Sequence, residues 1–135
     1  MPDAVEVRNL VKTFGSHTAL DDVSLSIAPG EMVALIGASG SGKSTLLRHI
    51  PGFVAADRGM VSVLGRATQT DGSISRSIRG QRSEIGFVFQ QFNLVGRLSV
   101  MTNVLTGLLH RSPGWRRALA RFSHAERLQA MQALE

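Results

Sequence analysis

The chain of 135 residues contains no cysteine, which excludes disulfides, catalytic thiols and cysteine metal sites. It also lacks a long apolar run. The longest strictly apolar stretch before the glycine-rich segment is residues 32–36, whereas a membrane-spanning helix needs about 20 such residues. The N-terminus has neither a basic start nor an apolar core, so we expect no signal peptide and a cytoplasmic location.

Acidic residues are scarce in the second part of the chain. Residues 58–135 hold eleven Lys or Arg against four acidic residues, whereas residues 1–57 hold four against six. The basic part could face nucleic acid, anionic lipid or an acidic partner, or it could be a solvated Arg-rich surface. Only Trp115 and Phe122 accompany the late arginines, too few for a platform that stacks single-stranded bases. We therefore expect no nucleic-acid partner.

Apolar residues make up 43% of the chain, an ordinary share for a globular protein and too high for a disordered one. Because a domain typically holds about 100–200 residues, the length fits one domain. A chain of this size can bury about two-thirds of its unfolded surface, so an independent core is possible.

Short apolar segments between turn residues predict strands in the first part of the chain. The first strand carries Val5, Val7 and Leu10, and a second strand region, up to Ile27, follows a turn at Asp21–Asp22. Further turns or breaks are expected at residues 14–17 and 29–30. These two strands form an antiparallel β element at the front of the chain.

Continuous apolar runs at residues 32–36 and 85–89 predict strands that are buried on both faces of a sheet. Another strand is expected at residues 60–64, and the polar, Arg-rich residues 66–83 predict a surface excursion. A helix is expected at residues 42–50, where Pro51 ends it. Strands that alternate with a helix predict an α/β fold.

After Gln90 the apolar spacing becomes helical, with Val100, Val104, Leu105, Leu108 and Leu109. A break is expected at Ser112-Pro113-Gly114. Ser123 and Glu126 have the spacing of a capping box and predict the start of a last helix. The apolar side of that helix would consist of Leu128, Met131 and Leu134.

The glycine-rich segment carries most of the chemistry. Residues 37–45 read Gly37, Ala38, Ser39, Gly40, Ser41, Gly42, Lys43, Ser44 and Thr45, which matches G-x-x-x-x-G-K-[ST] in full. The glycines let the backbone bend around a phosphate, and successive N–H groups then face one concavity. Lys43 would meet the β- and γ-phosphates, and the Ser44 hydroxyl would ligate Mg²⁺. The sequence therefore predicts a phosphate-binding loop for a nucleotide.

Two further residues bear on the class of P-loop protein. Phe14 could stack on adenine, or it could be a core or turn phenylalanine. Gln90 follows an expected strand, where α/β folds bind ligands, and its amide oxygen could ligate Mg²⁺ or orient a water. It could equally be a loop glutamine, and the adjacent Gln91 leaves the register open.

The P-loop, Phe14-Gly15, residues 85–94 and residues 98–104 together resemble the ATP-binding subunit of ABC transporters. Within that family, residues 37–48 and 90–100 look most like the phosphonate-import subgroup. The resemblance implies that Phe14 stacks on adenine, that Gly37 to Thr45 cradles the phosphates of ATP, and that Gln90 contacts Mg²⁺ and the attacking water near the transmembrane partner. It also implies coupling of ATP hydrolysis to uptake of phosphonate or a related oxyanion.

The resemblance further implies partners and a layout. A second ATP-binding subunit would form a homodimer, transmembrane permease subunits would be contacted directly, and a separate solute-binding protein indirectly, at the inner face of a bacterial membrane. The implied fold is the P-loop NTPase core of ABC type, incomplete in this chain. Its parts would be an antiparallel β element (1–30), the core through the Q-loop (31–92) and the start of a helical subdomain (93–135).

The sequence departs from the family pattern in two ways. Pro51 stands where a small residue such as Ser is expected, and it should alter the helix end more than nucleotide binding. No stretch after Val104 resembles a signature loop, a Walker B strand or a switch histidine, so we expect poor autonomous turnover. The four histidines are interpreted as ordinary surface or satisfied residues: His17, His49, His110 and His124.

Three hypotheses follow from the sequence. The chain is the N-terminal portion of an ABC import ATPase, or a nucleotide-binding module that does not hydrolyse, or an unrelated P-loop kinase or nucleic-acid-linked NTPase. ATP turnover separates the first two. Phosphoryl transfer to an acceptor, or RNA affinity that falls steeply with salt, would indicate the third.

Overall fold

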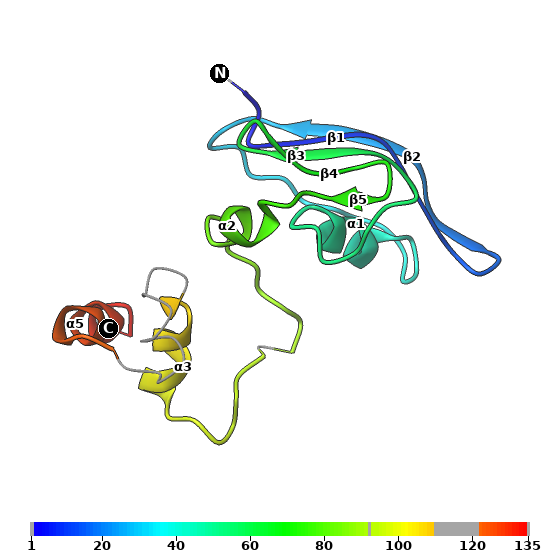
Figure 1. Ribbon diagram of the computed structural model, residues 1–135. Helices are drawn as coiled ribbons and strands as arrows, with labels where there is room; N and C mark the ends of the chain where they lie inside the picture. The colour runs from blue at the N-terminus through cyan, green and yellow to red at the C-terminus, as the bar shows by residue number, and fades with distance from the viewer. Residues whose placement is uncertain (1, 92, 110–121, 135) are drawn as a thin grey trace. The chain divides into compact units, whose positions relative to one another are not determined.

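The computed structural model describes residues 2–91, 93–109 and 122–134 (Figure 1). These residues form two compact units, residues 1–86 and residues 87–135, and each unit is described by itself. The expected break at residues 112–114, together with Trp115 and His110, lies outside the described residues.

The first unit contains a five-stranded antiparallel sheet with the strand order β2-β1-β3-β4-β5 (Figure 1). Its strands are β1 (Val5–Phe14), β2 (His17–Ile27), β3 (Arg58–Val63), β4 (Arg66–Thr70) and β5 (Ser73–Ile74). The expected antiparallel β element is therefore confirmed, as is the turn that joins β1 to β2. β3 pairs with β1 on the side away from β2.

The β1–β2 hairpin contains bulges that shift its register. Val7 and Leu10 are both buried although they are three residues apart, because a bulge lies between them. Asn9 and Asp22 have positive φ angles of 47° and 51°, and the Asn9 side chain donates a hydrogen bond of 2.8 Å to Asp22. The predicted turn at Asp21–Asp22 is wrong, since β2 runs through it and the irregularity is absorbed as a bulge.

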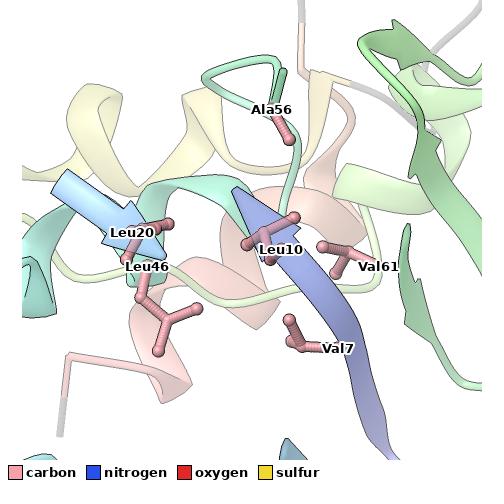
Figure 2. Packing of buried hydrophobic residues seen from close by; sticks show 6 residues of the cluster. All are labelled: Val7, Leu10, Leu20, Leu46, Ala56 and Val61. Atoms are coloured by element: carbon pink, nitrogen blue, oxygen red, sulfur yellow. The ribbon is translucent and has the colours of Figure 1, made fainter. Parts of the chain in front are cut away.

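The core of the first unit lies between this sheet and helix α1 (Lys43–His49). Figure 2 shows its six buried side chains, which come from the sheet, the helix and the loop before β3: Val7, Leu10, Leu20, Leu46, Ala56 and Val61. The helix predicted at residues 42–50 is confirmed, with Gly42 and Ile50 as its caps. The Leu46 side chain packs in the core and so anchors α1 to the sheet. This anchor also positions the glycine-rich segment that precedes the helix.

The strands predicted at residues 32–36 and 85–89 are wrong for this structure. Neither segment has strand structure, and Met32, Ile36 and Val88 are 98%, 94% and 87% exposed. A strand of a parallel sheet needs hydrogen-bonding neighbours on both sides. Within the described residues, no strand pairs with either segment, so the apolar pattern is present without the partners that would bury it.

Residues 66–83 are not the surface excursion that their polarity predicts. They form β4, β5 and helix α2 (Ile78–Arg82), and the side chains of Thr68, Gln69 and Gln81 are buried. Gln69 is only 1% exposed. Buried polar side chains need hydrogen-bond partners, and Gln69 finds them on the last residue of α1 and on the chain that follows the helix.

The second unit contains helices α3 (Val100–Thr106) and α5 (His124–Gln132), which pack together (Figure 1). The predicted capping box is confirmed, because Ser123 and Glu126 exchange hydrogen bonds between side chain and backbone. The predicted apolar side of α5 is wrong, since Leu128 and Met131 are half-exposed and Ala130 is the buried residue. Among the described helices, none is long and apolar enough to cross a membrane.

Candidate functional site

The glycine-rich segment, residues 37–45, continues into α1, so that Lys43, Ser44 and Thr45 form the first turn of the helix. Gly42 caps the helix with φ 86°, and a Cβ at this position would lie 2.4 Å from the Ala19 carbonyl oxygen. Leu20 Cδ2 would be 3.2 Å away. Only glycine therefore lets the loop pack this closely against β2.

The surroundings of Gly40 are open, whereas those of Gly42 are closely packed. Gly40 also has a positive φ of 84°, but a Cβ there would meet nothing within 4 Å. Between the two glycines, the Ser41 amide closes a turn on the Ala38 carbonyl at 3.3 Å. This alternation of glycine and serine bends the backbone into the concavity that a phosphate-binding loop requires.

The Lys43 ammonium is directed back into the loop. Its Nζ donates hydrogen bonds of 2.7 Å to the carbonyl oxygens of Gly37 and Ala38, and one of 3.2 Å to Ser41 Oγ. An ammonium has three donors, so the loop itself fixes the charge at its centre. A positive point charge in a backbone concavity is the arrangement that binds a phosphate.

The loop and the β1–β2 hairpin enclose one pocket of about 360 Å³. Its lining consists of Phe14, His17, Ala19, Ser39, Gly40, Ser41, Gly42, Lys43, Ser44 and Thr45. The structure therefore brings together Phe14 and most of the predicted loop residues, while Gly37 and Ala38 lie behind Lys43 as its acceptors. Because an aromatic side chain and a cationic one line the same pocket, its lining suits a ligand with a flat base and phosphates.

An ion pair between Lys12 and Asp57 lies beside Phe14 at the end of β1. Asp57 accepts a hydrogen bond of 2.8 Å from Lys12 Nζ and one of 2.7 Å from the Thr13 amide. The hydrogen bond from Lys12, followed by that from Thr13, lowers the pKa of the Asp57 carboxyl below its usual value. Lys12 Nζ also lies 5.3 Å from the centre of the Phe14 ring. Phe14 itself is 49% exposed, so its ring is available to a ligand.

His17 is a pocket residue that sequence reasoning missed. The sequence predicts an ordinary surface or satisfied histidine here, yet His17 is the cross-strand partner of Phe14 and lines the same pocket. The two-residue turn at Gly15 and Ser16 was the available signal, because such a turn places its flanking residues opposite each other.

Gln90 lies in the second unit, where its side chain is exposed. Its role in a site shared with the loop is therefore a prediction that rests on the sequence. Gln91 is exposed as well, and its carbonyl accepts a hydrogen bond from the Asn93 amide.

The donor chemistry of the site suits Mg²⁺. Mg²⁺ prefers hard oxygen ligands, keeps several waters and uses few protein groups together with substrate phosphates. Ser44 presents an exposed hydroxyl to the pocket beside Lys43. No group of three or more His, Asp or Glu side chains in the described ranges could hold a metal by itself. The residues therefore fit a magnesium ion that arrives with a phosphorylated ligand.

Comparison with protein families and curated proteins gives consistent matches. The sequence model of one family, described as ABC transporter, matches residues 20–135. The chain is 56% identical over 138 residues to phosphonates import ATP-binding protein PhnC 2 of Pseudomonas savastanoi pv. phaseolicola, covering 100% of this chain and 50% of that protein. It is 62% identical over 133 residues to phosphonates import ATP-binding protein PhnC of Cupriavidus pinatubonensis, covering 96% and 47%. The chain thus spans about half the length of the curated relatives that it matches.

Solved structures give the same result for the fold. A dimeric post-hydrolysis ATP-binding cassette, MJ0796 bound to ADP and Pi, matches with a TM-score of 0.78 and 33% identity, over 96% of this chain and 55% of that one. A nucleotide-free ATP-binding cassette from an ABC transporter matches with a TM-score of 0.67 and 30% identity, over 89% and 46%. The fold class expected from the sequence is confirmed by this likeness.

Proposed function

We propose a nucleotide-binding function for this chain from the premise that it belongs to the ABC transporter family. The chain would supply the P-loop part of the ATP-binding subunit of an importer. The observation that carries this proposal is the single pocket in which the Lys43 loop and the Phe14 ring face the same space.

In this proposal, different residues of the pocket bind different parts of the nucleotide. Phe14 stacks on the adenine, with His17 beside it, and the backbone amides of residues 39–45 bind the phosphates. Lys43 exchanges its contacts with Gly37 and Ala38 for the stronger ones that phosphate oxygens offer to an ammonium.

Magnesium would be held by Ser44, with Gln90 as the second protein ligand. When bound, the ion neutralises charge on the β- and γ-phosphates. The residues of this chain then hold the phosphates in place, and the loop amides exclude water from the faces that they cover.

The transported solute is proposed from the names of the relatives. Both curated relatives described above are phosphonate importers' ATP-binding proteins, so we propose phosphonate or a related oxyanion. Partners follow from the same reasoning: a second ATP-binding subunit, the permease subunits and, indirectly, a solute-binding protein. We propose a location on the cytoplasmic face of the membrane, and the parts 1–30, 31–92 and 93–135 as its β element, core and helical subdomain.

Binding and hydrolysis are assigned separately. The 135 residues contain the P-loop and the proposed Q-loop residue, but no stretch resembles a signature loop, a Walker B strand or a switch histidine. We propose that these residues bind ATP and that turnover belongs to the whole importer subunit. A module that binds without hydrolysing is therefore the second candidate for the chain on its own.

Titration of the chain with MgATP in a calorimeter tests this proposal. The native chain should bind, and Lys43→Ala should weaken binding at least about tenfold because it removes a charge-assisted contact, worth about 1.5–3 kcal/mol. Arg76→Ala is the matched control, since it removes one exposed positive charge from the surface. Equal affinity of the Lys43→Ala variant and the native chain would overturn the proposal.

A further inference from the structure

The C-terminal end of α1 is held by side chains from two distant segments of the first unit. The helix ends at His49, Ile50 is its C-cap, and Pro51 follows. Pro51 is fully buried and has no amide hydrogen, so it cannot continue the helical hydrogen bonding. Helix ends leave carbonyl groups that need other partners. Backbone amides of the following turn cap the last two carbonyls of the helix, from Gly52 to His49 and from Phe53 to Arg48, at 2.9 Å each. Gln69 adds a second hydrogen bond to the His49 carbonyl, and Arg82 binds the carbonyls of this turn itself.

Gln69 on β4 bridges the helix end to the chain that returns to the sheet. Its Nε2 donates a hydrogen bond of 2.6 Å to the His49 carbonyl and a longer one of 3.3 Å to that of Val54. Its Oε1 accepts one of 2.7 Å from the Ala56 amide. Because this side chain is almost completely buried, water cannot replace these contacts if they are lost.

Arg82 on α2 holds the next two residues. Its Nε donates a hydrogen bond of 2.8 Å to the Pro51 carbonyl, and its Nη2 donates another to Gly52. The guanidinium also lies 5.0 Å from the centre of the Phe53 ring. The planar group therefore fixes three consecutive residues in one geometry, which a lysine could not do.

The opposite end of α1 is seated on the hairpin. Gly42 packs against the Ala19 carbonyl, and Leu46 shares the core with Leu20. Helix α1 is thus supported on β2 at its N-terminal end and held by Gln69 and Arg82 at its C-terminal end. The two supports together set the angle of the helix, and so the placement of Lys43 relative to Phe14.

We infer that Gln69 and Arg82 are positioning residues of the nucleotide site: they hold α1 so that the phosphate loop and the aromatic end of the pocket accept one ligand together. The inference rests on the proposed function, since it concerns the same pocket. Phosphates contact the loop on α1, whereas adenine contacts the β1–β2 hairpin. Loss of the C-terminal support lets the helix pivot about Leu46 and changes the distance between these two elements.

This geometry makes a specific prediction for two ligands. Inorganic triphosphate needs only the loop, whose own hydrogen bonds are local to residues 37–43. ATP needs the loop and the hairpin at their native separation. A change in the helix angle therefore weakens ATP binding and leaves triphosphate binding unchanged. A variant that merely unfolds part of the population lowers both affinities by the same factor.

The experiment measures the dissociation constants of ATP and inorganic triphosphate, each with Mg²⁺, by calorimetry on the 135-residue chain. The variants are Gln69→Glu, which keeps the size and acceptor but loses the donor to His49, and Arg82→Gln. Arg79→Gln is the matched control, because Arg79 is an exposed arginine on the same helix. Arg82→Lys serves as a second variant in case Arg82→Gln does not fold.

We expect Gln69→Glu and Arg82→Gln to raise the dissociation constant of ATP at least about tenfold and that of triphosphate less than about twofold. Arg79→Gln should leave both unchanged. Equal loss of both ligands, or no loss of either, would overturn the inference. Native protein that binds neither ligand would instead overturn the proposed function, so the two failures are distinguishable.

Discussion

Two short apolar segments of the first unit have similar sequences and opposite structures. Residues 60–63 read Met60-Val61-Ser62-Val63 and form most of β3, with Val61 fully buried. Residues 32–36 read Met32-Val33-Ala34-Leu35-Ile36, a longer apolar run, yet they have no strand structure and are exposed.

The difference between the two segments is their neighbours. Residues 60–63 pair with β1 on one side and β4 on the other. Within the part of the chain that the structure describes, residues 32–36 pair with no strand. Apolar sequence thus sets the tendency to be buried, but hydrogen-bonded partners decide whether a strand forms.

We expect the largest effect when a buried residue of the paired strands is compared with an exposed residue of the unpaired segment 32–36. Leu10→Ala removes a fully buried side chain from the core and should lower the free energy of unfolding by about 2–5 kcal/mol. Ile36→Ala removes an exposed one and should change it by no more than about 0.5 kcal/mol. Urea unfolding of both variants measures this. Similar losses would show that residues 32–36 are also packed, and would break the comparison.

A second, smaller effect tests the contact between the loop and its neighbour β2. Gly40→Ala should cost about 1–2 kcal/mol, because its φ is positive but the surrounding space is open. Gly42→Ala should cost more, because its Cβ would also collide with the Ala19 carbonyl. Thermal unfolding of the two variants gives the order. If Gly40→Ala proved the more damaging, the described packing of Gly42 on β2 would be wrong.

The smallest effect concerns the ion pair beside Phe14. The pKa of Asp57 is lowered in the folded chain, chiefly by the hydrogen bond from Lys12. Its contribution to stability is therefore fully present above the unfolded pKa of about 3.9 and is lost as the pH falls through the lower folded pKa. Asp57→Asn should make stability less dependent on pH below about 4. An unchanged acid dependence in urea unfolding would contradict this.

The sequence predicted the backbone of the glycine-rich segment and its helix better than it predicted the sheet. Residues 39–42 form a turn that leads into the helix beginning at Lys43, because glycines at fixed spacing specify a local shape that needs few distant contacts. The run at residues 85–89 has a strand sequence, but its structure depends on neighbours that its own pattern cannot specify. The likeness to a solved ATP-binding cassette supports the fold class independently of this pattern, because that longer chain aligns with 96% of this one.

Polar residues were the hardest to place from the sequence. Gln69 and Arg82 lie in a stretch whose composition resembles an exposed loop. Their hydrogen-bond partners are backbone carbonyl groups, which every residue has, so the sequence does not indicate them. His17 was likewise overlooked because its role follows from its register with Phe14. Each of these residues takes its role from a backbone group or strand that is distant in the sequence.

Hydrogen exchange of the 135-residue chain, with and without MgATP, tests the central claim most directly. We predict slow exchange at residues 60–63, fast exchange at residues 32–36, and added protection at residues 39–45 when MgATP is present. Lys43→Ala should abolish that added protection. Unchanged exchange at residues 39–45 with saturating MgATP would contradict the account.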